Sequence, residues 1–77
     1  MDINQAIITR INELCEIRNR TINDICLKGG LTPSTYYEIV KGRTKSFTIT
    51  TIKRICQGAG ISLSEFFNKD YFNEYLE

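Results

Sequence analysis

The side chains best suited to chemistry lie between residues 33 and 54, and they suit hydrogen bonding and charge pairing. On a helix over residues 33–41, four polar side chains share one face: Ser34, Tyr37, Glu38 and Lys41. From Lys41 to Arg54 there are five cations and no acid, so this block carries +5, although the whole chain carries only +1. Cations that begin where a polar helix ends are well placed for phosphate contacts beside a groove. The alternative is a solvated basic loop.

The sequence offers little for catalysis or metal binding. It has no histidine, and its three cysteines, Cys15, Cys26 and Cys56, show no CxxC spacing. Each cysteine falls on or beside an apolar helix face, which predicts small buried hydrophobic residues, with redox sensing or metal binding as the alternative. In the absence of a metal-ligand cluster, a phosphate loop or a nucleophile–base pair, we expect no enzyme, no cofactor and no small-molecule ligand.

Composition and length indicate one small soluble domain. The chain has 77 residues, of which 42% are hydrophobic and 25% charged. Its apolar runs are too short for a membrane span and it shows no signal peptide, so we expect a cytoplasmic location. Residues 65–77 hold four acids against one base, a net charge of −3. The basic block and this acidic segment are therefore separated by the ten residues 55–64.

The polar face belongs to the second of two helices expected between residues 21 and 42. Thr21 is a typical N-cap for a helix over residues 22–28. Gly29 and Gly30 follow at once, and one of them can take the left-handed conformation that a sharp turn requires. The first helix of the pair is thus expected to end at these glycines.

The second helix of the pair has its own start and stop signals. Thr32 offers a capping hydroxyl, Pro33 suits the first helical position, and the helix is expected to reach about Lys41, before Gly42. Two apolar helices joined by a short glycine turn, the second with a polar outer face, are typical of a helix-turn-helix.

Further helices are expected on both sides of this pair. Asp2 and Gln5 form a capping box for a helix that ends near residue 18, and Thr48 or Thr50 opens another that ends near Ala59. Gly58 weakens that helix by about 1 kcal/mol relative to alanine. A capping box at residues 62–65 starts a short fifth helix, and an apolar stripe over residues 71–76 indicates a possible sixth.

The sequence resembles the Cro and phage-repressor type of helix-turn-helix domain, the Xre family. The resemblance covers roughly residues 10–67 and is carried by RINEL, T-INDIC-GGL-PSTYYEI-KG and TIKRIC-GAGISLSEFF. It implies an all-α, compact five-helix bundle of the lambda repressor-like type, with a DNA-binding domain over residues 1–68 and a C-terminal extension over residues 69–77. One departure is Arg20, where relatives usually have a small aliphatic residue; either a hydrophobic staple is lost or a cation is gained near the phosphates.

The resemblance also implies which residues contact double-stranded DNA. The family's base-reading positions fall on Pro33, Ser34 and Glu38, with Tyr37 and Lys41 on the same front. For Glu38, a solvent-facing carboxylate is the alternative. The expected phosphate contacts are Thr21, Asn23, Arg43, Thr44 and Lys45.

One such module reads few base pairs, so we expect a homodimer. The candidate dimer contacts are Phe66, Phe67, Tyr71, Phe72, Tyr75 and Leu76. Alternatively, this stripe folds back over its own core, or the acidic tail shields the domain's own basic face.

The functional prediction is a sequence-specific transcriptional regulator, most simply a repressor, from a phage, mobile element or bacterial chromosome. The alternative is a protein-interaction module of the same fold, such as an antitoxin or anti-repressor, with little DNA binding of its own. The modest net charge, Pro33 and the carboxylate of Glu38 keep that alternative open.

Overall fold

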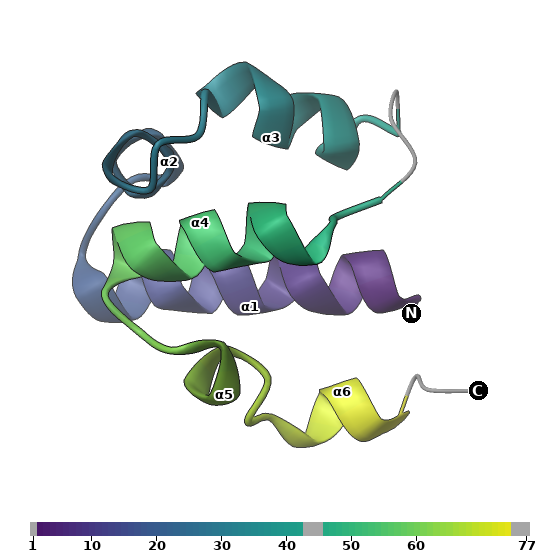
Figure 1. Cartoon of the computed structure of the whole chain (residues 1–77). Helices are drawn as coiled ribbons and strands as arrows, with labels where there is room; N and C mark the ends of the chain where they lie inside the picture. The colour runs from purple at the N-terminus through teal and green to yellow at the C-terminus, as the bar shows by residue number, and fades with distance from the viewer. Residues whose placement is uncertain (1, 43–45, 75–77) are drawn as a thin grey trace.

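The computed structural model describes residues 2–42 and 46–74, and this part of the chain is all-helical (Figure 1). The helices are α1 (Ile3–Arg18), α2 (Ile22–Lys28), α3 (Pro33–Val40), α4 (Ile49–Ala59), α5 (Leu63–Phe66) and α6 (Asp70–Glu74). The expected five-helix bundle with a sixth C-terminal helix is confirmed. None of the described helices is both long and apolar enough to cross a membrane.

The helices begin where the sequence places its caps. The carboxylate of Asp2 accepts from the Gln5 amide at 2.9 Å while the Gln5 side chain accepts from the Asp2 amide, which completes a capping box. The hydroxyls of Thr21, Thr48 and Ser62 each accept from the amide three residues on.

Thr32 is the exception among the predicted caps. Its hydroxyl bonds to the hydroxyl of Thr35 at 2.8 Å and makes no side-chain cap bond. The predicted capping hydroxyl is therefore wrong at this helix. Pro33 still takes the first helical position, where no backbone amide needs a partner.

One hydrophobic core joins all six helices. α1 and α4 run side by side through the middle, with α2 and α3 on one side of them and α5 and α6 on the other (Figure 1). Its fully buried side chains include Ile11, Ile25, Ile55 and Phe66. Cys26 and Cys56 are also buried, and all three cysteines are free thiols. Burial raises the pKa of the Cys56 thiol to about 11. This agrees with the prediction that the cysteine packs as a small buried hydrophobic residue.

Two glycines let α2 and α4 cross closely. A methyl group on Gly58 would overlap the carbonyl oxygen of Ile25, and one on Gly29 would overlap the carbonyl oxygen of Arg54. The helix propensity of Gly58 predicts only a weak point in α4. In the fold, the absence of a side chain there is what allows α2, the first helix of the pair, to pack against α4.

The C-terminal segment folds back on the domain. Phe72 of α6 is 4% exposed and Phe66 is fully buried, so both are core residues of the single chain. This burial agrees with the alternative in which the stripe packs over its own core, and contact of Phe66 and Phe72 with a second copy stays a prediction. Phe67 and Tyr71 are half-buried against the same core, while Tyr75 and Leu76 lie outside the described residues.

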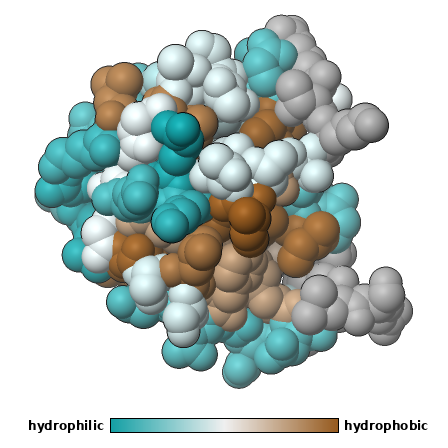
Figure 2. Space-filling view, viewed as in Figure 1, coloured by the Kyte–Doolittle hydropathy of each residue, from teal (hydrophilic) through white to brown (hydrophobic). Residues whose placement is uncertain are grey.

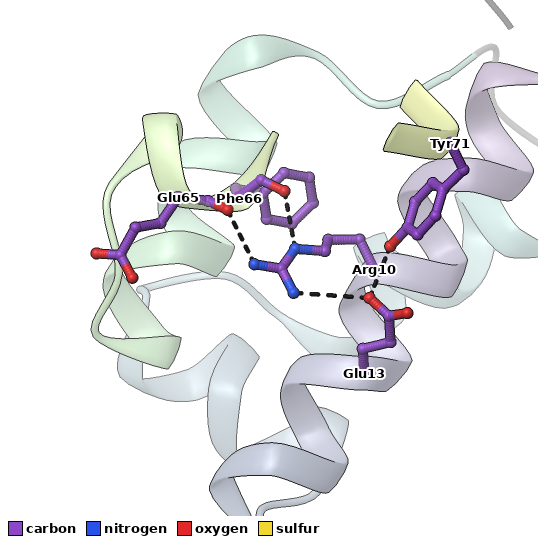
Figure 3. A network of polar contacts seen from close by, with 5 residues as sticks. All are labelled: Arg10, Glu13, Glu65, Phe66 and Tyr71. Carbon is purple, nitrogen blue, oxygen red and sulfur yellow. Dashed lines mark hydrogen bonds and ion pairs between the residues drawn. The ribbon is translucent and has the colours of Figure 1, made fainter. Parts of the chain in front are cut away.

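A buried arginine ties α1 to the C-terminal helices (Figure 3). Arg10 is 7% exposed, and its guanidinium donates to the carbonyl oxygens of Phe66 at 2.8 Å and Glu65 at 2.9 Å. It also pairs with Glu13 at 3.6 Å, and Glu13 accepts a hydrogen bond from the Tyr71 hydroxyl. The free carbonyl groups at the end of α5 are thereby satisfied, and α6 is fixed against α1.

Candidate nucleic-acid interface

The inner side of α3 is anchored in the core. Tyr36 and Ile39 are buried, and the Tyr36 ring packs against Phe47 with ring centroids 6.1 Å apart. Burial of the phenol raises the pKa of Tyr36 to about 12, so it is neutral at physiological pH. Tyr36 is thus a core residue, as the helical period predicts. This anchoring fixes the rotation of α3 about its own axis.

The outer side of α3 carries the predicted polar residues. Ser34, Tyr37 and Lys41 are exposed, and Tyr37 has 41% of its surface accessible. They are spaced three and four residues apart, which puts them on one face of the helix. Pro33 and Glu38 are half-buried beside them. The structure therefore places all five predicted base-contact residues on one helix and its C-cap, three of them exposed.

The turn between α2 and α3 is closed by backbone bonds. Gly30 takes the left-handed conformation with φ 75°, the Leu31 amide donates to the Cys26 carbonyl at 2.8 Å, and the Gly30 amide donates to the Leu27 carbonyl at 3.2 Å. This is a Schellman motif, the sharp helix end that a glycine at this position predicts.

Arg54 of α4 holds the same turn from outside. Its guanidinium donates to the carbonyl oxygen of Gly30 at 3.0 Å. The sequence alone counts Arg54 only as one of the basic block, and nothing in its local pattern reveals this partner 24 positions away. One cation of the block therefore positions the helix pair from the α4 side.

The other predicted DNA contacts fall in two places. Thr21 and Asn23 are exposed at the start of α2, where the Thr21 hydroxyl already accepts from the Asp24 amide at 3.2 Å and can still donate its own proton. Arg43, Thr44 and Lys45 lie outside the described residues. The cations of the basic block that the structure does describe, Lys41, Lys53 and Arg54, are all exposed.

Comparisons with known proteins identify the family of the chain and a protein of similar fold. Residues 11–66 match the protein family described as Helix-turn-helix, and the chain belongs to that family, whose members are DNA-binding regulatory domains. In solved structures, the chain is similar to the crystal structure of the prophage Lp1 protein 11. The two are 35% identical with a TM-score of 0.82, and the match covers 95% of this chain and 97% of the other. No curated protein matches the chain.

Proposed function

We propose that this chain is a transcriptional repressor that reads a specific DNA sequence with α3 in the major groove. The observation that carries the proposal is the division of α3 into a buried side, Tyr36 and Ile39, and an exposed polar side, Ser34, Tyr37 and Lys41. The major groove admits one helix, and a helix that reads bases must be held rigidly by its back. Membership of the helix-turn-helix family supports the same function.

Each residue of the polar face suits a different base edge. The Ser34 hydroxyl can donate or accept, and the Lys41 ammonium can donate to the acceptors of guanine. The Glu38 carboxylate can accept from a cytosine amino group. Tyr37 and Pro33 offer apolar surface to a thymine methyl group. These five residues set sequence preference in our proposal.

Phosphate contacts on both sides of α3 supply affinity and register. On one side we assign them to Thr21 and Asn23, which are exposed at the start of α2. On the other side we assign them to Arg43, Thr44 and Lys45, which directly follow α3 in the sequence. Contacts of this kind carry no sequence information, and those made by Arg43 and Lys45 make binding dependent on salt.

We further propose that the protein binds as a homodimer on two half-sites. Figure 2 shows hydrophobic side chains gathered across the middle of one face, over α4 and between α4 and α5. Ile49, at the start of α4, is 63% exposed, and Phe67 and Tyr71 keep part of their surface accessible. An exposed apolar surface of this kind is typical of a face that a second copy covers.

The experiment is selection of bound duplexes from random DNA by the purified protein, with its mass in solution measured alongside. A two-fold repeated motif with half-sites about one helical turn apart supports a dimeric reader. The selected site is then titrated in increasing salt, where binding must weaken steeply. No enrichment of any motif at low salt contradicts the proposal.

One observation favours a second candidate, a protein-interaction module such as an antitoxin or anti-repressor. The polar face of α3 includes the carboxylate of Glu38, and Asp24 is exposed near the start of α2. Both acids repel phosphates. If the protein binds no duplex at low salt but captures a defined protein through the α3 face, this second candidate replaces the first.

A further inference from the structure

An open cleft lies where α1, α2 and α4 end, away from the polar face of α3. Its volume is about 570 Å³, and its lining includes Ile17, Arg18, Arg20, Lys28, Gln57 and Gly60. Three of these residues are cations, and no acid is among the described residues that line the cleft. Figure 2 shows the hydrophilic side chains that gather on this left edge of the molecule. The cleft is therefore a concentrated positive surface.

The cations and the apolar wall together define what the cleft can bind. Arg18 and Lys28 lie in the last turns of α1 and α2, where they also complement helix carbonyl groups, whereas Arg20 lies in the linker between these helices. Ile17 is 67% exposed and adds an aliphatic surface beside the cations. A DNA backbone offers phosphates, but its only apolar surface is the small deoxyribose ring, which covers little of Ile17. An acidic peptide with large apolar side chains satisfies both features.

The chain itself contains such a peptide. Residues 70–77, DYFNEYLE, hold three acids and no base, and they include Tyr75 and Leu76. We propose that the acidic C-terminal segment of one copy docks in the cleft formed by Arg18, Arg20 and Lys28 of another copy. This inference rests on the self-association proposed above. It names the oppositely charged residues that make the contact between two copies specific.

The geometry requires the contact to be between copies. α6 ends at the opposite end of the molecule from the cleft, near the N-terminal end of α1 (Figure 1). α1 has 16 residues and is about 24 Å long. The three residues after Glu74 span about 10 Å when extended. The segment therefore reaches the cleft of a neighbour and not its own.

The direct test uses the peptide as a probe. The full chain, labelled with nitrogen-15, is titrated with a synthetic peptide of residues 70–77 and with a matched peptide that has Asn and Gln in place of Asp and Glu. We expect amide shifts at Ile17, Arg18, Lys28 and Gln57 from the acidic peptide only, with a dissociation constant on the order of 1 mM or tighter. Equal shifts from the neutral peptide, or shifts confined to other surfaces, overturn the proposal.

Charge reversal then tests the contact in the whole protein. Arg18→Glu with Lys28→Glu should raise the dissociation constant for self-association about fivefold or more, and Asp70→Lys with Glu74→Lys should do the same. Mixing the two variants should restore association, because each supplies the charge that the other lacks. Arg20→Glu, outside any helix, checks that the loss does not come from unfolding, and Lys53→Glu on α4 is the control cation outside the cleft.

DNA binding by the same variants separates this inference from the proposed function. If reversal in the cleft leaves self-association unchanged and weakens DNA binding, the cleft is a phosphate site and the inference is wrong. If self-association falls while the same variant still selects its DNA motif, both the inference and the proposed function stand. If no duplex is selected but the peptide binds the cleft, only the DNA-reading proposal fails.

Discussion

The hydroxyl of Tyr71 donates a hydrogen bond to Oε1 of Glu13 at 2.7 Å and joins α6 to α1 across 58 positions of sequence. The same carboxylate pairs with the buried guanidinium of Arg10 (Figure 3). Glu13 thus stands between a cation and a neutral donor. The network fixes the C-terminal helix to the helix that starts the chain.

Replacing Tyr71 with phenylalanine should therefore loosen α6 while leaving the ring in place. Loss of one hydrogen bond to a charged acceptor lowers the free energy of unfolding by about 1–2 kcal/mol. The measurement is urea unfolding, with far-UV circular dichroism to confirm the helix content. Asn73→Ala, an exposed change on the same helix, is the control and should be close to neutral. Equal stability of the Tyr71→Phe variant and the parent would show that the hydrogen bond contributes nothing.

Alkaline pH should destabilise the fold through its buried phenols. The pKa of Tyr36 is raised from 10.0 to about 12, chiefly by burial, and burial together with the Glu13 hydrogen bond raises the pKa of Tyr71. The folded state therefore favours the protonated phenols, and the stability they contribute is complete below pH 10 and is lost as pH rises above it, for Tyr36 through about 12. The buried thiol of Cys56, with its pKa raised to about 11, acts in the same direction from about pH 9.

This pH dependence can be measured as the urea concentration at the midpoint of unfolding, determined at pH values between 8 and 12. Tyr36→Phe removes one titrating group, so the decline between pH 10 and 12 should be shallower in that variant than in the parent. An identical decline in both would mean that Tyr36 does not contribute to it.

Most of the helix boundaries could be predicted because their signals are local. A hydroxyl or carboxylate caps the amide three residues on at Asp2, Thr21 and Thr48, and a glycine takes the left-handed conformation at Gly30 and Gly60. Each of these signals needs only a few neighbouring residues. Thr32 shows the limit of the rule, because it stands at the N-cap of α3 and its hydroxyl still makes no cap bond.

The tertiary contacts of Arg10, Arg54 and Gly58 could not be predicted from the residues next to them in the sequence. The partners of Arg10 are carbonyl groups 55 and 56 positions away, and the partner of Arg54 is 24 positions away. An arginine on a helix is usually solvated, so a single sequence does not indicate that one is buried. On α3, in contrast, the helical period separates core from surface, and the division of its two faces could be predicted.

Replacing Gly58 with alanine should destabilise the domain, although alanine has the higher helix propensity. In a solvent-exposed helix, glycine to alanine stabilises by about 1 kcal/mol. Here the new methyl group meets the carbonyl oxygen of Ile25, so Gly58→Ala should destabilise the domain by about 1–3 kcal/mol as α2 is pushed from α4. The loss of stability is measured by thermal unfolding of the Gly58→Ala variant. Gln57→Ala, an exposed change at the neighbouring position, is the control. A Gly58→Ala variant more stable than the parent would mean that α2 and α4 do not cross so closely.

The basic segment after α3 should set the salt dependence of DNA binding. Replacing Arg43 and Lys45 together with alanine removes two phosphate contacts in our proposal. Binding to every duplex should weaken, and the slope of the logarithm of the binding constant against that of salt should fall by about 2. Lys69→Ala, at a cation in the C-terminal segment, is the control. An unchanged slope in the double variant would show that the phosphate contacts lie elsewhere.

The polar face of α3 should set which sequence is bound rather than how strongly DNA is bound in general. Ser34→Ala and Glu38→Gln leave the anchored side of the helix, Tyr36 and Ile39, untouched, so α3 keeps its position. Loss of a base contact costs about 1–3 kcal/mol at the affected base pair and relaxes the preference there, while affinity for unrelated DNA stays close to that of the parent. Selection from random duplexes by each variant, compared position by position with the parent, measures this. For Glu38→Gln the affected position is expected to be a cytosine. If affinity for all DNA rises and the selected motif is the same, Glu38 repels phosphates and reads no base.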